Sequence, residues 1–120
     1  MQAPTFEFVT IDAVDPERVA AFWSAFLRQP IGESMDDGRF VFVPGSASMP
    51  TVCVHRVPEA KTIKNRLHFD FGVQDLDETT REVESLGGSW GGAEHTLGRA
   101  RWRTLADPEG NEFDVTVTAG

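Results

Sequence analysis

A few ionisable side chains in this sequence have the types and spacing that small-molecule chemistry requires. His68 and Asp70 alternate with large apolar residues between positions 67 and 73, and Asp114 does so between 112 and 117. Successive side chains of a strand point to opposite faces, so these polar groups share the face that the apolar residues leave free. The same rule adds three residues of earlier strands: Phe8, Cys53 and His55. A surface that is part apolar and part ionisable is typical of a small-ligand pocket.

The elements that must position these residues follow one order twice, a strand, a helix and three strands. Asp15-Pro16 predicts the start of the first helix, and a capping box from Asp75 to Glu78 predicts the second. Alternation and turn residues place the strands at 6–11, 31–35, 39–43, 51–57, 67–73, 90–95, 101–106 and 112–117. We therefore expect an α+β fold of two βαβββ modules, about residues 5–58 and 66–118, with each sheet covered by a helix on one face.

Length and composition narrow the class of protein. The chain has 120 residues, the size of one compact domain, and a formal net charge of −8. Such an acidic protein suits nucleic acid poorly and tolerates a cationic small ligand. No apolar run reaches the roughly 20 residues that a membrane-spanning helix needs. Cys53 is the single cysteine, so we expect no intrachain disulfide and a cytoplasmic location.

Several motifs resemble those of the vicinal-oxygen-chelate superfamily, which includes glyoxalase I, extradiol dioxygenases and bleomycin-resistance proteins. The run His68-Phe69-Asp70-Phe71-Gly72-Val73-Gln74-Asp75 resembles an entry strand of its module, and Asp107-Pro108-Glu109-Gly110-Asn111-Glu112-Phe113-Asp114 resembles the closing motif. Asp15-Pro16-Glu17-Arg18 and Arg56-Val57-Pro58-Glu59 are similar to its actinobacterial glyoxalase-like branch. The resemblance implies the glyoxalase/bleomycin resistance/dihydroxybiphenyl dioxygenase fold.

The resemblance also implies four positions for metal ligands, at the first and last strands of each module. They fall on Phe8, on Cys53 or His55, on His68 and on Asp114. Two histidines and a carboxylate suit a divalent iron, manganese, nickel or zinc ion in a lyase, isomerase or dioxygenase. Because Phe8 cannot bind a metal, the sequence favours the alternative, a metal-free protein that binds a small, cationic aromatic compound. The resemblance further implies a homodimer.

Four further features have competing interpretations. Arg66 clamps an anionic substrate, or it pairs with a carboxylate of the final turn, which we favour. Trp102 and Trp90 stack on a flat ligand or pack in the protein. Cys53 is expected to be a small buried hydrophobe rather than a reactive thiol. Alternation indicates one solvated strand face for three arginines: Arg99, Arg101 and Arg103.

Overall fold

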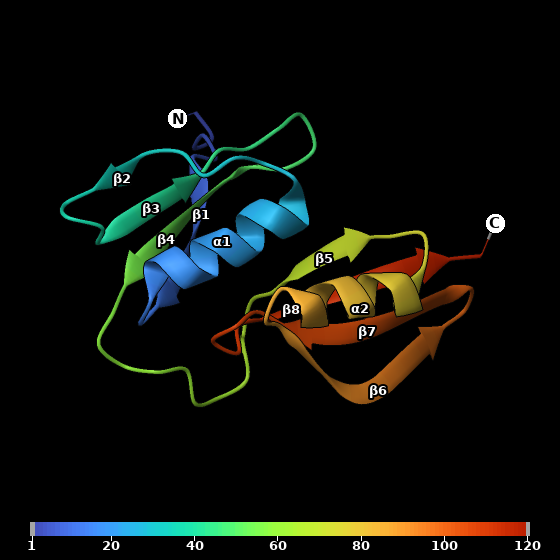
Figure 1. The fold of residues 1–120 in the computed structure, drawn as a ribbon. Helices are drawn as coiled ribbons and strands as arrows, with labels where there is room; N and C mark the ends of the chain where they lie inside the picture. The colour runs from blue at the N-terminus through green and yellow to red at the C-terminus, as the bar shows by residue number, and fades with distance from the viewer. Residues whose placement is uncertain (1, 120) are drawn as a thin grey trace. The chain divides into compact units, whose positions relative to one another are not determined.

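The computed structural model describes residues 2–119 as two compact units, which divide after Glu59 (Figure 1). Each unit is a four-stranded mixed sheet with one helix. The strand order is β1-β4-β3-β2 in the first unit and β5-β8-β7-β6 in the second, so the topology repeats. In both sheets, the first and last strands of the module are parallel neighbours and the other pairs are antiparallel. The predicted α+β architecture of two βαβββ modules is confirmed.

The first unit folds around an amphipathic helix, α1 (Pro16–Leu27). The Asp15 carboxylate accepts a hydrogen bond from the Arg18 N–H and so caps the helix start, as predicted. Phe22, Trp23 and Phe26 are buried, and α1 packs on β1, β3 and β4. The strands of this unit are β1 (Phe8–Ala13), β2 (Ser34–Met35), β3 (Phe40–Val43) and β4 (Thr51–Arg56).

The second unit repeats this plan around α2 (Leu76–Ser85). The Asp75 carboxylate accepts a hydrogen bond from the Glu78 N–H, and α2 packs on β6, β7 and β8. Buried Phe113 and Val115 of β8 face this helix side, which leaves their neighbours on β8 for the free face. The strands of this unit are β5 (Phe69–Gly72), β6 (Ser89–Leu97), β7 (Ala100–Ala106) and β8 (Glu112–Thr118).

Two expectations about element ends are wrong. The strand predicted from residue 31 contains only Ser34–Met35, and the strand predicted from residue 67 begins at Phe69. Leu67, expected to pack against the helix, is 87% exposed because it lies in the connector before the sheet begins. Among the described residues, no helix is long and apolar enough to cross a membrane.

Candidate functional site

The free face of the second sheet carries the candidate site, and strand register assembles it. Asp70 of β5 pairs with Asp114 of β8, which pairs in turn with Thr104 of β7. Residues paired across neighbouring strands point to the same face, so the two carboxyl groups and the hydroxyl form one row. The apolar residues that alternate with them have to face α2 to be buried, and this requirement sets the row's orientation.

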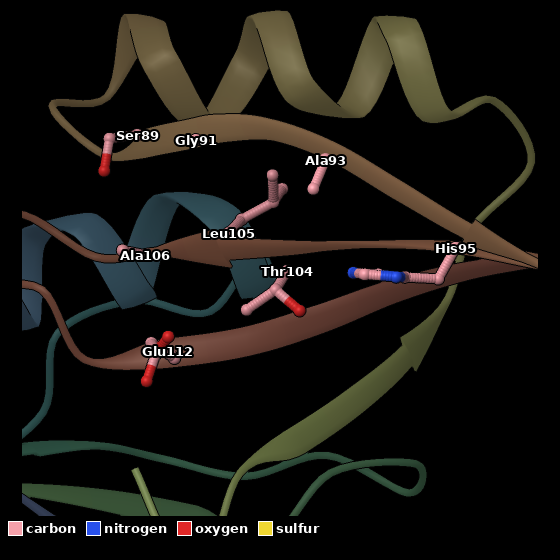
Figure 2. A pocket seen from close by; sticks show the side chains of 8 residues that line it. All are labelled: Ser89, Gly91, Ala93, His95, Thr104, Leu105, Ala106 and Glu112. Carbon is pink, nitrogen blue, oxygen red and sulfur yellow. The ribbon is translucent and has the colours of Figure 1, made fainter. Parts of the chain in front are cut away.

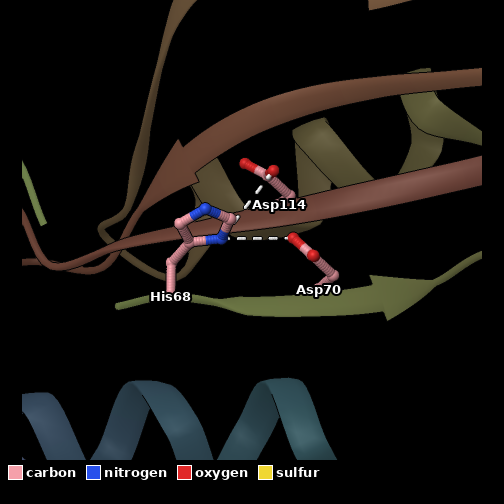
Figure 3. Close-up of side chains that lie close together, drawn as sticks. All are labelled: His68, Asp70 and Asp114. Carbon is pink, nitrogen blue, oxygen red and sulfur yellow. Dashed lines mark ion pairs between the residues drawn. The ribbon is translucent and has the colours of Figure 1, made fainter. Parts of the chain in front are cut away.

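His68 joins this row from the end of the connector, one residue before β5. Its Nδ1 atom lies 3.2 Å from Asp70 Oδ1 and 3.8 Å from Asp114 Oδ2 (Figure 3). A ligand atom from each of the three residues lies within 4.8 Å of the others. The structure therefore brings His68 and Asp114 together, as the alternation indicates, and adds Asp70, which the sequence had placed only in the surrounding pocket.

The two carboxyl groups influence each other's charge. Partial desolvation, a hydrogen bond with Asp114 and the charge of Asp114 raise the pKa of Asp70, while His68 opposes the shift. Asp70 is therefore the carboxyl group that holds a proton more readily than an isolated aspartate does. A positively charged group placed between the two carboxylates would relieve this repulsion.

Thr104 supports Asp114 from the neighbouring strand. Its hydroxyl donates a hydrogen bond to Asp114 Oδ1 over 2.7 Å, and the Asp114 side chain is only 14% exposed. Asp114 Oδ2 is the oxygen nearer to His68. Sequence analysis did not single out Thr104, although the alternation of β7 already placed it beside Trp102 on the same face.

A cavity of about 270 Å³ adjoins this row on the same face. It forms at a bulge in β6: between the pairs Trp90–Leu105 and Glu94–Arg103, the residues of β6 outnumber the single residue of β7, Thr104. Its walls are lined by eight residues, all in the second unit (Figure 2): Ser89, Gly91, Ala93, His95, Thr104, Leu105, Ala106 and Glu112. Thr104 thus belongs both to the cavity and to the support of Asp114.

The carboxylate of Glu112 is held at the cavity wall by the connector before β5. The Asn65 N–H donates to Glu112 Oε1 over 2.8 Å, and the ammonium groups of Lys61 and Lys64 lie 3.6 and 3.5 Å from this carboxylate. The hydrogen bond from Asn65 is the largest cause that lowers the pKa of Glu112. The expected pairing of Arg66 with the final turn is wrong, because its neighbours occupy Glu112 and Arg66 makes no ion pair among residues 2–119.

Of the three arginines expected on a solvated face, Arg99 and Arg101 are exposed, whereas Arg103 is buried. Only 8% of it is exposed, since its strand face is the one that α2 covers. Its guanidinium donates to Asp77 over 2.7 Å and to Glu94 over 3.0 Å, and it lies 4.0 Å from the ring centre of Trp90. The Trp90 ring therefore packs on the helix side of the sheet. Because Trp102 lies on the free face, the two rings do not form one stacking surface for a ligand.

Trp102 lies on the free face, where its ring is tilted against His95 with the ring centres 5.6 Å apart. His95 is exposed and forms one wall of the cavity. The signal that could have found it is its place opposite Trp102 in an antiparallel pair, but the bulge hides that register in the sequence.

The candidates of the first unit lie on the free face of its own sheet. Cys53 and His55 lie two residues apart on that face of β4. The two candidates for the metal-ligand position of the first module therefore have the same orientation. Cys53 is 2% exposed, and burial raises the pKa of its thiol, as expected for an unreactive cysteine. Phe8 packs edge-on against Phe42, with ring centres 5.7 Å apart.

His55 has a more specific environment. Its Nδ1 atom lies 3.3 Å from Asp12 Oδ1, and its ring stacks on Phe40 with centres 4.7 Å apart. The other ring nitrogen, Nε2, is buried and has no hydrogen-bond partner among the described residues. An imidazole nitrogen without a hydrogen-bond partner has the chemistry of a metal ligand.

The chemistry of the donor set in the second unit fits a divalent cation. One imidazole and two carboxylates converge from separate positions, one carboxylate supported by Thr104 and the other destabilised as an anion. Oxygen-rich sets with one nitrogen suit manganese or iron better than they suit the thiolate-seeking metals. The residues present can therefore hold such an ion.

Comparison with known families agrees with the repeated topology. Residues 8–116, most of the chain, match the glyoxalase-like domain family. This chain belongs to the glyoxalase-like domain family. No curated protein matches the sequence.

Solved structures share the fold of this glyoxalase-like chain at low sequence identity. A variant of the fosfomycin resistance protein FosX from Listeria monocytogenes, in complex with Mn(II) and 1S,2S-dihydroxypropylphosphonic acid, superposes with a TM-score of 0.75 at 17% identity, covering 95% of this chain and 90% of that one. A glyoxalase/bleomycin resistance protein/dioxygenase family enzyme from Burkholderia phytofirmans PsJN has a TM-score of 0.74 at 17% identity, covering 94% and 98%. A lactoylglutathione lyase from Agrobacterium tumefaciens has a TM-score of 0.65 at 16% identity, covering 97% and 95%.

Proposed function

We propose that this glyoxalase-like protein binds a divalent metal ion, manganese or iron, through His68, Asp70 and Asp114 and acts on a small molecule as a lyase, isomerase or dioxygenase. The observation that carries the proposal is the convergence of these three side chains on one face. Phe8 cannot bind a metal, but Asp70 supplies a third ligand from within the second module. The Mn(II) complex of the FosX variant, a protein of the same fold, supports the choice of metal.

The bound metal and the residues around it would contribute in different ways. A metal bound there would supply Lewis-acid polarisation of a substrate oxygen. The Thr104 hydroxyl donates a hydrogen bond to Asp114 Oδ1 and so fixes the orientation of the Asp114 carboxylate. Asp70 lies beside Asp114, and a bound cation would offset the repulsion between these two carboxylates. The prediction that His55 contributes a ligand from the first module stays a prediction.

Metal titration tests the proposal directly. Chelator-treated protein is titrated with Mn(II), and free Mn(II) is measured by electron paramagnetic resonance. We expect one ion per chain, and loss of binding in the variants His68→Ala and Asp114→Asn. Asp36→Asn is the matched control, because Asp36 is exposed, pairs only weakly with Arg39 at 3.6 Å and has a positive φ of 52° that asparagine tolerates. No binding of manganese, iron, nickel or zinc to the wild type would refute the proposal.

A second candidate function is a metal-free binding protein of the bleomycin-resistance kind. It is favoured by the mutual contacts of His68, Asp70 and Asp114, which give each group a partner without an ion. Under this alternative, the acidic chain sequesters a cationic aromatic compound near Trp102. A wild type that binds no metal, but whose tryptophan fluorescence is quenched by such a compound in a salt-sensitive way, would establish it.

We also propose that the two modules work as a single domain in a cytoplasmic homodimer. The matched family region spans both modules, and each sheet has an edge strand that a second copy could cover. Light scattering on purified protein measures the mass directly. A mass equal to that of one 13.2 kDa chain at all concentrations would contradict the dimer.

A further inference from the structure

Two of the four polar side chains that line the cavity beside the β6 bulge, Thr104 and Glu112, offer hydrogen-bond acceptors. The hydroxyl proton of Thr104 is given to Asp114, so the lone pairs of Thr104 Oγ1 are what this residue can offer to a ligand. The Glu112 carboxyl group accepts a hydrogen bond from the Asn65 N–H and lies beside the ammonium groups of Lys61 and Lys64, so its oxygens act as hydrogen-bond acceptors. Ser89 and His95 can act either way. A ligand that donates hydrogen bonds fits these walls better than one that accepts them.

The charges around the cavity also favour a ligand that is not anionic. No lysine or arginine is among the eight residues that line it, although Lys61 and Lys64 approach Glu112. These two ammonium groups are engaged with the Glu112 carboxylate itself. In the metal-free protein, an anionic ligand would therefore meet the carboxyl groups of Asp70 and Asp114 on the same face without a cation in the wall to bind it.

The bulge limits the size of what can bind. A volume of about 270 Å³ corresponds to roughly nine water molecules at about 30 Å³ each. The bulge residues that line this volume are Gly91 and Ala93. A Cβ atom on Gly91 would meet no atom within 4 Å, which shows that the space beside it is open. Larger side chains at these positions would occupy the hollow.

We propose that this hollow is the substrate subsite beside the metal centre, and that it takes a small neutral or cationic molecule rich in hydroxyl or amino groups, with Gly91 and Ala93 setting the size limit. The inference deepens the proposed function and rests on it, because the molecule bound here is the one that the centre would act on. Thr104 is the shared residue, since it accepts from the ligand while it donates to Asp114.

Two probes of similar size and opposite chemistry test the ligand class. Metal-free, ¹⁵N-labelled wild-type protein is titrated at constant neutral pH with protonated Tris, which carries hydroxyl and ammonium donors, and separately with malonate, a dianion with acceptors alone. We expect Tris to shift the amide resonances of Gly91, Ala93 and Thr104 saturably, and malonate to leave them unchanged. Shifts caused by malonate and not by Tris, or no saturable shift with either probe, would overturn the proposal.

A filled cavity tests the location. Gly91→Leu places a side chain in the open space, and its backbone needs no positive φ; we expect it to weaken the apparent affinity for Tris at least tenfold. Gly72→Leu is the matched control, because its Cβ also meets no atom within 4 Å but Gly72 does not line the cavity. Equal Tris affinity in Gly91→Leu and wild type would refute the site.

The Mn(II) titration, repeated on the same samples, separates this inference from the proposed function. We expect Gly91→Leu to bind Mn(II) as the wild type does. Wild-type protein that binds Tris at the bulge but no Mn(II) would refute the proposed metal-dependent function and leave the binding subsite standing. Wild-type protein that binds Mn(II) but not Tris would refute the subsite alone.

Discussion

Replacing Thr104 by valine tests the support of the metal centre with little change in side-chain volume. The Thr104 hydroxyl donates to Asp114 Oδ1 over 2.7 Å, and the Asp114 side chain is 14% exposed. A hydrogen bond to a charged group contributes about 1.5–3 kcal/mol. Loss of a partner that orients a metal ligand typically weakens metal binding by about 10–100-fold, or about 1.4–2.8 kcal/mol. The two ranges agree, so we expect Thr104→Val to raise the Mn(II) dissociation constant by about 10–100-fold.

The assay is the same Mn(II) titration by electron paramagnetic resonance, with thermal unfolding recorded to show that each variant is folded. Thr104→Ser keeps a hydroxyl and is expected to bind Mn(II) nearly as the wild type does. Thr96→Val is the matched control, because Thr96 is an exposed threonine of β6 outside the cavity wall. Wild-type affinity in Thr104→Val would show that the hydrogen bond to Asp114 has no role in holding the ion. A loss in Thr104→Ser as large as that in Thr104→Val would refute the reasoning in the same way.

Three further outcomes are expected. Desolvation and Asp114 raise the pKa of Asp70 above its ordinary 3.8, so the stability contributed by the Asp70 proton is present at low pH and is lost as the pH rises through the raised pKa. Asp70→Asn should remove this pH dependence of the free energy of unfolding, measured by denaturant titration. The same variant should also lose Mn(II) binding. Arg103→Leu should lower the melting temperature more than Arg101→Leu does, since the Arg103 side chain is 10% exposed and that of Arg101 54%; equal shifts would contradict the role given to the buried guanidinium. Phe113→Ala should cost about 3–5 kcal/mol in the free energy of unfolding, because Phe113 is fully buried, and a loss under about 1 kcal/mol would contradict its place in the core.

Alternation predicted the orientation of most strand residues correctly, for a simple reason. Val115 and Phe113 of β8 have to be buried, and the period of two then turns Asp114 to the opposite face. The same rule separated Thr104 from Arg103, but the solvated environment predicted for Arg99, Arg101 and Arg103 is wrong for Arg103. A guanidinium is buried only when several partners meet it, and Asp77 of α2 and Glu94 of β6 come from positions that local sequence does not connect.

The proposed metal-binding residues also show what the sequence can predict and what it cannot. Alternation put His68, Asp70 and Asp114 on the free face, whereas the proximity of Asp70 to Asp114 depends on the parallel pairing of β5 with β8 in one particular register. The cavity was not predictable either, because it results from extra residues in β6 opposite Thr104. Gly91 and Gly92 lie in this stretch, but two adjacent glycines do not by themselves predict a cavity.

Local order along the chain determined the two βαβββ modules, their helix caps and the face on which each strand residue lies, because helix and strand periods and capping groups act over a few neighbouring residues. Tertiary structure decided which residues on those faces meet one another. It placed Asp70 beside Asp114, closed α2 over Arg103 and opened the cavity next to Thr104. Those outcomes depend on register between strands distant in sequence, and register is set by the packing of the whole sheet against its helix.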